Sequence, residues 1–316
     1  MTKPPEPFDH SPAGRCAVSP ASPLAIACCS ATKSVPAGLR ARDLAGDPAG
    51  FGERWSLALA ASPAACRADA LYTGRGFAAV RRAAAAAGAD LAVLSAGLGV
   101  VMGATPVPSY SLTLATGPDA LRACAPDVRP ADWWRAASAS PFACDLPGEL
   151  AGRPVAVLAL TRGYAAMIAE TLEALDGRMD RVRLIGLGLE RVVPACAARS
   201  VLPYDRRIEP LLAGGTAGEF AARATAFHLA SRSGRGWDLD EEREEAERLS
   251  RAGTAPAVPG RRRVTDDDIL AAVDAAGGRA SAAAALRGLR RSGVACGFER
   301  MARLLSGAGT TGPVPA

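Results

Sequence analysis

The chain has 316 residues, of which 49% are hydrophobic, 22% are charged and only 5% are aromatic, and its formal net charge is +5. This length suggests about two domains with a sizeable core, and the modest positive charge is compatible with an acidic partner. The eight cysteines form no C-x-x-C pair and the two histidines lie at no zinc-ligand spacing, so we expect no metal site.

The N-terminal stretch and the hydropathy pattern bear on where the protein resides. Residues 1–20 contain five prolines, which predicts a disordered arm rather than a signal peptide. No apolar run reaches the roughly 18 residues that cross a membrane. We therefore expect a cytoplasmic protein with reduced thiols and no membrane partner.

The first predicted strand is an apolar run at residues 24–29. It ends in a polar group that contains Ser30, Thr32 and Lys33. A weakly patterned segment follows to about residue 70, and then a predicted helix at residues 77–87.

A second predicted strand at residues 91–94 follows that helix and leads into Ser95, Gly97 and Gly99. Ligands of open α/β sheets bind outside the carboxyl ends of the strands, and glycine lets the backbone approach a ligand closely. The prolines of the next loop stiffen it and would bring Tyr110 back toward the strand end. This stretch is predicted to form half of a site, the alternative being a strand followed by an ordinary turn.

The later elements continue the alternation of strands and helices, which predicts an α/β core at residues 21–232 with an open, mostly parallel sheet flanked by helices. In a predicted helix around Trp133 and Trp134, we expect one tryptophan in the core and the other against a neighbouring element or a ligand. The strongest strand signal ends near Tyr164. The other elements are expected at residues 118–124, 155–160, 164–175, 183–188, 201–205 (an edge strand) and 216–228.

The C-terminal quarter has a different composition. Residues 237–251 are nearly all charged and are predicted to form a solvated helix, which together with a linker occupies residues 233–263. Residues 264–316 contain three short predicted helices with glycine turns, the pattern of a small all-α helix-turn-helix module. Its arginines suit contact with double-stranded DNA, the alternative being a small helical bundle with arginine on its surface. The arginines predicted to bind DNA are Arg261, Arg262, Arg263, Arg290, Arg291, Arg300 and Arg303.

Residues 29–33 contain an S-x-x-K element, and residues 71–74 contain a Y-T-G element. Residues 94–100 with 108–112 contain an L-S-x-x-x-G…P-Y-x-L element in which Ser109 is inserted before Tyr110. Taken together, these elements resemble those of the YaaA-like family of peroxide-stress proteins and, more distantly, of uracil-DNA glycosylases. The resemblance covers about residues 24–135 and implies an α/β core that handles DNA; the basic C-terminal module is not part of the family's core.

The leading functional hypothesis is a DNA glycosylase that hydrolyses the N-glycosidic bond of a modified base and leaves an abasic site. Lys33, Ser30 and Thr32 would hold a phosphate, Tyr110 or Tyr164 would stack on the flipped base, and Ser95, Gly97 and Gly99 would read its edge. Asp205, or else Asp132, would activate water. Alternatively, Lys33 would attack the sugar if burial lowers its pKa.

The alternative is a non-catalytic DNA-binding protein of oxidative stress, which needs only the basic module and a stable core. The chain has no P-loop and no dinucleotide fingerprint, so we expect no cofactor in either case. His228, within an alanine-rich helix, is predicted to pack or to lie at the surface rather than to serve a hydrolase triad. A base-excising enzyme with an extra DNA-binding module would suit defence against phage DNA that carries modified bases.

Overall fold

The computed structural model describes residues 22–46, 50–256, 265–275, 286, 289, 296 and 298–307. The chain divides into two compact units, Met1–Pro256 and Ala257–Ala316, each described here by itself. The predicted N-terminal arm at residues 1–20 lies outside the described residues.

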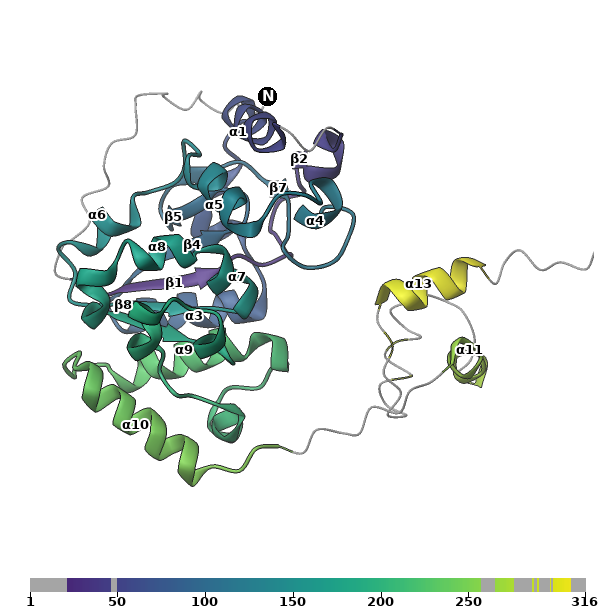
Figure 1. Ribbon diagram of the computed structural model, residues 1–316. Helices are drawn as coiled ribbons and strands as arrows, with labels where there is room; N and C mark the ends of the chain where they lie inside the picture. Colours follow the sequence, from purple (N-terminus) through teal and green to yellow (C-terminus); the bar gives the residue numbers. More distant parts are fainter. Residues whose placement is uncertain are drawn as a thin grey trace, which may run out of the picture. The chain divides into compact units, whose positions relative to one another are not determined.

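A five-stranded sheet with the order β5-β4-β1-β8-β9 forms the centre of the first unit (Figure 1). β1 (Leu24–Cys28) lies between β4 (Asp90–Ser95) and β8 (Ala156–Ala159), and β9 (Val182–Ile185) follows β8. These four strands are parallel, whereas β5 (Gly99–Met102) runs antiparallel to β4. The strands are short. Their residues are apolar because the sheet is covered on both faces, as parallel sheets usually are.

Helices lie on both sides of this sheet (Figure 1). α3 (Arg75–Ala86) and α9 (Phe220–Ser231) pack against each other and against the central strands. α5 (Pro130–Ser138) contacts α1 (Phe51–Ala61), α7 (Arg162–Met167) and β5. The expectation of an α/β core with a mostly parallel sheet and flanking helices is therefore confirmed.

The remaining elements of the first unit are short, except for α10 (Leu239–Ala252). Two small strand pairs join β2 (Leu39–Arg40) to β7 (Tyr110–Ser111) and β3 (Cys66–Arg67) to β6 (Pro106–Val107). The other elements are η1 (Ala41–Leu44), α2 (Ala68–Leu71), α4 (Leu121–Cys124), α6 (Leu146–Leu150), α8 (Ala169–Glu173), η2 (Asp176–Arg181), η3 (Leu189–Arg191), η4 (Ala195–Ser200), η5 (Arg206–Leu211) and η6 (Ala217–Glu219).

Three elements differ from the expectations. Helix α1 was not expected; Phe51, Trp55 and Leu59 bury one face of it, at a spacing typical of a helix. Strand β5 was not expected either, because Gly99, with a φ of +79°, turns the chain back along β4. The edge strand predicted at residues 201–205 is reduced to one parallel bridge between Leu184 and Val201.

The second unit contains α11 (Asp266–Ala275) and α13 (Phe298–Gly307). Thr265 caps α11 by accepting the N–H of Asp268 at 3.1 Å. A small apolar core gathers Ile269, Val273, Leu286, Leu289 and Met301. The middle helix of the predicted helix-turn-helix lies largely outside the described residues, so that module stays a prediction.

Among the residues that the structure describes, no helix combines the length and the apolar character needed to cross a membrane.

Candidate functional site

The order of the sheet identifies the place where a ligand is expected. The chain passes from β1 to β4 on one side and later returns to β8 on the other side of β1. In open α/β sheets the loops diverge at such a switch point and leave a crevice outside the carboxyl ends of the strands. Here those ends are Cys28 of β1, Ser95 of β4 and Ala159 of β8.

Six side chains from these loops and their neighbours form one group, which we call the tyrosine–lysine cluster: Cys29, Lys33, Tyr72, Ser95, Tyr110 and Tyr164. Four of its members, Lys33, Ser95, Tyr110 and Tyr164, were predicted as site residues from separate segments. The structure brings these four together.

Ser95 is the innermost member of the cluster. Its side chain is fully buried, and its Oγ accepts the N–H of Gly97 at 3.3 Å and that of Leu98 at 3.0 Å. The same Oγ lies 2.5 Å from the hydroxyl of Tyr110, which in turn lies 3.1 Å from the hydroxyl of Tyr72. Because both backbone N–H groups donate to Ser95, its own O–H remains to donate to Tyr110.

Gly97 allows Tyr110 to reach Ser95. A Cβ on Gly97 would lie 2.7 Å from Cε2 of Tyr110 and 2.9 Å from Cζ2 of Trp55. Trp55 donates its indole N–H to the carbonyl of Gly97 at 2.8 Å and meets the ring of Tyr110 edge-on. The close approach predicted for this glycine therefore serves an aromatic packing contact.

Cys29 and Tyr164 join the cluster from the β1 and β8 sides. The sulfur of Cys29 lies 3.0 Å from the hydroxyl of Tyr164 and 3.9 Å from that of Tyr110. Its neighbour Cys28 points away and donates its S–H to the carbonyl of Ala159 at 3.1 Å, and burial raises the pKa of Cys28. Burial likewise raises the pKa of Tyr110 and Tyr164, so both hydroxyls stay protonated at neutral pH.

Lys33 lies above the tyrosines. A single antiparallel bridge pairs its backbone with Tyr72, and its Nζ lies 4.7 Å from the ring centroid of Tyr110 and 5.6 Å from that of Tyr72. Burial lowers the pKa of the Lys33 amine, although Cys29 and Asp119 oppose this effect. Among the described residues, no carboxylate forms an ion pair with Lys33.

Ser30 and Thr32, which were predicted to hold a phosphate, are used within their own loop. The hydroxyl of Ser30 donates to the carbonyl of Thr32 at 2.7 Å and accepts the N–H of Gly74 at 3.1 Å. The N–H of Thr73 donates to the same carbonyl of Thr32 at 3.0 Å. These bonds place the segments around Lys33 and Tyr72 side by side.

The two predicted catalytic acids make other contacts. Asp132, on α5, pairs with Arg129 at 2.6 Å and also with Arg135. Asp205 caps η5 by accepting the N–H of Arg207 at 2.8 Å, and it pairs with the guanidinium of Arg207. Hydrogen bonds from these arginines lower the pKa of both carboxyl groups. Within the described part of the chain, neither bonds to the tyrosine–lysine cluster, and their role in activating water stays a prediction.

The aromatic residues proposed to stack on a base differ in their exposure. Tyr110 is fully buried, and Lys33 and Trp55 contact its ring. Tyr164 is partly exposed. Trp133 and Trp134 are both buried: the first donates to the carbonyl of Ala96 at 2.7 Å, and the second donates to Thr171 at 2.8 Å. Of these aromatic residues, Tyr164 is the most exposed.

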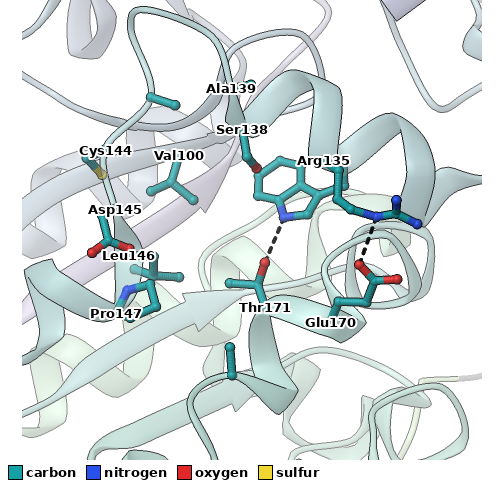
Figure 2. A pocket seen from close by; sticks show the side chains of 13 residues that line it. Val100, Arg135, Ser138, Ala139, Cys144, Asp145, Leu146, Pro147, Glu170 and Thr171 are labelled. Carbon is teal, nitrogen blue, oxygen red and sulfur yellow. Dashed lines mark hydrogen bonds and ion pairs between the residues drawn. The ribbon is translucent and has the colours of Figure 1, made fainter.

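A groove of about 640 Å³ lies between β5, α5, α6 and α8 (Figure 2). Val100, Trp134 and Leu146 form apolar walls, and Arg135 pairs with Glu170 at its edge at 3.1 Å. Among the described residues, none of those predicted to form the site lines this groove. The geometry around Lys33 therefore defines the candidate site, and this groove does not.

Two of the predicted DNA-binding arginines lie in described parts of the second unit. Arg303 is exposed on α13. Arg300 pairs with Asp266, its Nε lying 2.7 Å from Oδ1. The predicted contacts of Arg261, Arg262, Arg263, Arg290 and Arg291 lie outside the described residues.

The sequence reasoning did not select Tyr72 or Cys29 as site residues. Both lie within segments that carry the motifs, residues 29–33 and 71–74, but only the folded chain places them beside Ser95. One further signal was present: the chain has only two lysines, Lys3 and Lys33, among its 37 basic residues.

No protein-family model, curated protein or solved structure matches this chain. The YaaA-like resemblance therefore remains an expectation that rests on the quoted motifs.

Proposed function

We propose that this protein acts on DNA as a glycosylase that hydrolyses the N-glycosidic bond of a modified base and leaves an abasic site. The observation that carries the proposal is the tyrosine–lysine cluster itself. Lys33, Ser95, Tyr110 and Tyr164 come from separate segments of the chain and share one position at the carboxyl edge of the sheet. An edge of this kind is where α/β proteins bind their ligands.

The charges around this edge favour a polyanionic substrate. Lys33 follows β1, and Arg162, exposed at the start of α7, follows β8. Among the described residues, neither forms an ion pair with a carboxylate. Two cations at neighbouring strand ends suit the phosphates on either side of a flipped nucleotide.

Double-stranded DNA is the proposed partner of the arginine-rich second unit as well. Arg303 on α13 is exposed, and arginines of this kind contribute binding that depends on salt but not on sequence. A glycosylase with such a module would suit a defence against phage DNA that carries modified bases.

A non-catalytic DNA-binding protein is the second candidate, and one observation favours it. The hydroxyls of Ser95, Tyr72 and Tyr110 are buried and bond to one another. Within the described part of the chain, no carboxylate bonds to the tyrosine–lysine cluster. Such a closed arrangement stabilises a fold without requiring chemistry.

One assay separates the two candidates. The full chain is incubated with duplexes that carry single modified bases, and with an unmodified duplex; hot alkali then reveals abasic sites as strand breaks. We expect breaks at one class of modified base, and their loss in Lys33→Ala. The matched control is Arg181→Ala, which removes an exposed cation from the far, amino-terminal end of β9. Tight binding without breaks on any substrate would refute the glycosylase and leave the binding protein.

A further inference from the structure

The use of lysine in this chain is unusual. Lys3 and Lys33 are its only lysines, and every other basic residue of the 37 is arginine. Arginine binds phosphate at least as well as lysine, with a planar fork of donors, but it does not lose its proton in proteins. A chain that uses arginine for nearly every cation, Arg162 at the neighbouring strand end among them, does not need lysine for a phosphate contact alone. Lysine at position 33 therefore indicates a need for an amine.

Burial makes the amine of Lys33 easier to deprotonate. It lowers the pKa of Lys33, although Cys29 and Asp119 oppose this effect and the faces of the Tyr110 and Tyr72 rings, which lie 4.7 and 5.6 Å from Nζ, favour the cation. The buried guanidiniums of the same unit have carboxylate partners: Arg183 pairs with Glu242 at 2.9 Å, and Arg153 pairs with Asp90 at 2.8 Å. Among the described residues, Lys33 has no such partner to hold its proton. Lys33, which is partly exposed, therefore differs from these structural cations in having no carboxylate to hold its proton within the described part of the chain.

We infer that Lys33 forms an imine with the aldehyde at C1′ of abasic deoxyribose, so that the site covalently captures an abasic strand. The amine nitrogen adds to the C1′ carbonyl of the ring-opened sugar, and the carbonyl oxygen leaves as water with the two hydrogens of the amine. No oxidant or reductant is required, and water reverses the step. The inference rests on the proposed function for its substrate class, since an abasic site is the product of base release.

Tyr72 and Tyr110 act on this amine as positioning residues. Their rings lie 5.6 and 4.7 Å from Nζ, and Lys33 as a whole is partly exposed. Their hydroxyls bond to each other at 3.1 Å, so the rings are held in place from below. The buried cluster thus fixes where the amine lies without itself reacting.

Borohydride trapping tests the inference. The full chain is mixed with a duplex that carries a preformed abasic site, and sodium borohydride reduces any imine to a stable secondary amine that joins protein to DNA. We expect a cross-linked species on a denaturing gel, and a mass-spectrometric map that places the bond at Lys33. Lys33→Arg keeps the cation and should reduce cross-linking to background, whereas Lys3→Arg should leave it unchanged.

If Lys33→Arg fails to fold, the mass-spectrometric identification of the cross-linked residue in the wild-type protein still tests the inference. A bond at Lys3 or at the terminal amine, no bond at all, or undiminished cross-linking by folded Lys33→Arg would overturn the inference. Base release without trapping would leave the glycosylase standing and remove the imine. Trapping on abasic DNA without release of any base would uphold the imine and remove the glycosylase.

Discussion

Two groups of polar side chains in the first unit differ in how they accommodate a charge away from water. The tyrosine–lysine cluster lies at the carboxyl ends of β1 and β4. A second group, which we call the His228 network, joins Arg183, Tyr204, His228 and Glu242 across β9, α9 and α10. In the network each charge has a partner. Arg183 donates from Nε and Nη2 to the two carboxylate oxygens of Glu242, at 2.9 and 3.1 Å. In the cluster the one cation lies over aromatic rings.

The difference teaches which polar groups serve the fold. Burying a charge is costly, so a fold that only needs stability pairs its charges or leaves them in water. The His228 network follows this rule and fixes α10, expected to be solvated, to the edge of the sheet. The tyrosine–lysine cluster differs at Lys33, a partly buried amine with no carboxylate partner among the described residues, and ionisable groups in unusual surroundings concentrate at functional sites.

Breaking the pair in the His228 network should have the largest effect. Glu242→Ala leaves Arg183 buried without its carboxylate, which typically costs about 3–5 kcal/mol. The free energy of unfolding, measured by urea denaturation, should fall by that amount. The matched control is Asp240→Asn on the same helix, α10, which removes an exposed ion pair between Asp240 and Arg199 of η4. This substitution should change the free energy of unfolding little. Equal effects of the two substitutions would contradict the comparison.

Gly97→Ala should disturb the other group. The new Cβ would press on the rings of Tyr110 and Trp55, which lie within 3 Å of its position, and overpacking of this kind costs about 1–3 kcal/mol. Tyr110 would also move from its place beneath Lys33, so borohydride trapping should fall together with stability. Gly163→Ala, where a Cβ meets nothing within 4 Å, is the control. Retained trapping in folded Gly97→Ala would show that Tyr110 does not position the amine.

Gly97 also illustrates which features of the site could be predicted from the sequence. Its place after a strand predicted a close approach, but the partner, Tyr110, depends on the pairing of β2 with β7, which no local pattern contains. The main strands were predictable because each is a short apolar run that ends in small or polar residues. The antiparallel β5 was not, because its direction depends on the turn at Gly99. The buried role of Glu242 was equally hidden, since a charged helix gives no sign of which acid faces the sheet.

Acidification should weaken the His228 network in a defined window. The carboxylate of Glu242 only accepts, so Nε2 of neutral His228 donates to it at 3.0 Å while Nδ1 accepts from Tyr204. Burial, chiefly, lowers the pKa of His228 below its ordinary 6.5, despite Glu242, and Arg183 and Arg232 lower it further. The unfolded chain therefore takes up a proton first, and stability should fall as the pH drops below about 6.5, by at most about 1.4 kcal/mol per pH unit.

The measurement is the melting temperature between pH 8 and pH 5, with His228→Gln for comparison. The variant lacks the titrating ring, so its melting temperature should depend less on pH over this range. Below about pH 4.5 both proteins should lose stability further, because Arg183, joined by His228 in the wild type, lowers the pKa of Glu242 although burial opposes this. An equally steep decline of the variant above that pH would assign the effect to other groups.

Asp205→Ala should have a smaller effect and no consequence for chemistry. Asp205 caps η5, and losing a cap typically costs about 1 kcal/mol. Because its carboxylate is engaged by Arg207, we expect base release to continue unchanged in this variant, and likewise in Asp132→Asn. Loss of strand breaks in either folded variant would restore the carboxylate as the group that activates water, and would make the amine of Lys33 unnecessary for base release.

The smallest expected effect on the free energy of unfolding is that of Lys33→Met, which should not lower it as the other substitutions do. Lys33→Met keeps an unbranched side chain over the two tyrosine rings and removes a partly buried cation, so it should leave the unfolding free energy unchanged or raise it by about 0.5–1 kcal/mol. Borohydride trapping should disappear in the same variant. Burial lowers the pKa of Lys33, which means that folding opposes its protonation, and raising the pH should therefore narrow the stability difference from wild type. A marked loss of stability in Lys33→Met would show instead that the lysine serves the fold, and the contrast with the His228 network would then disappear.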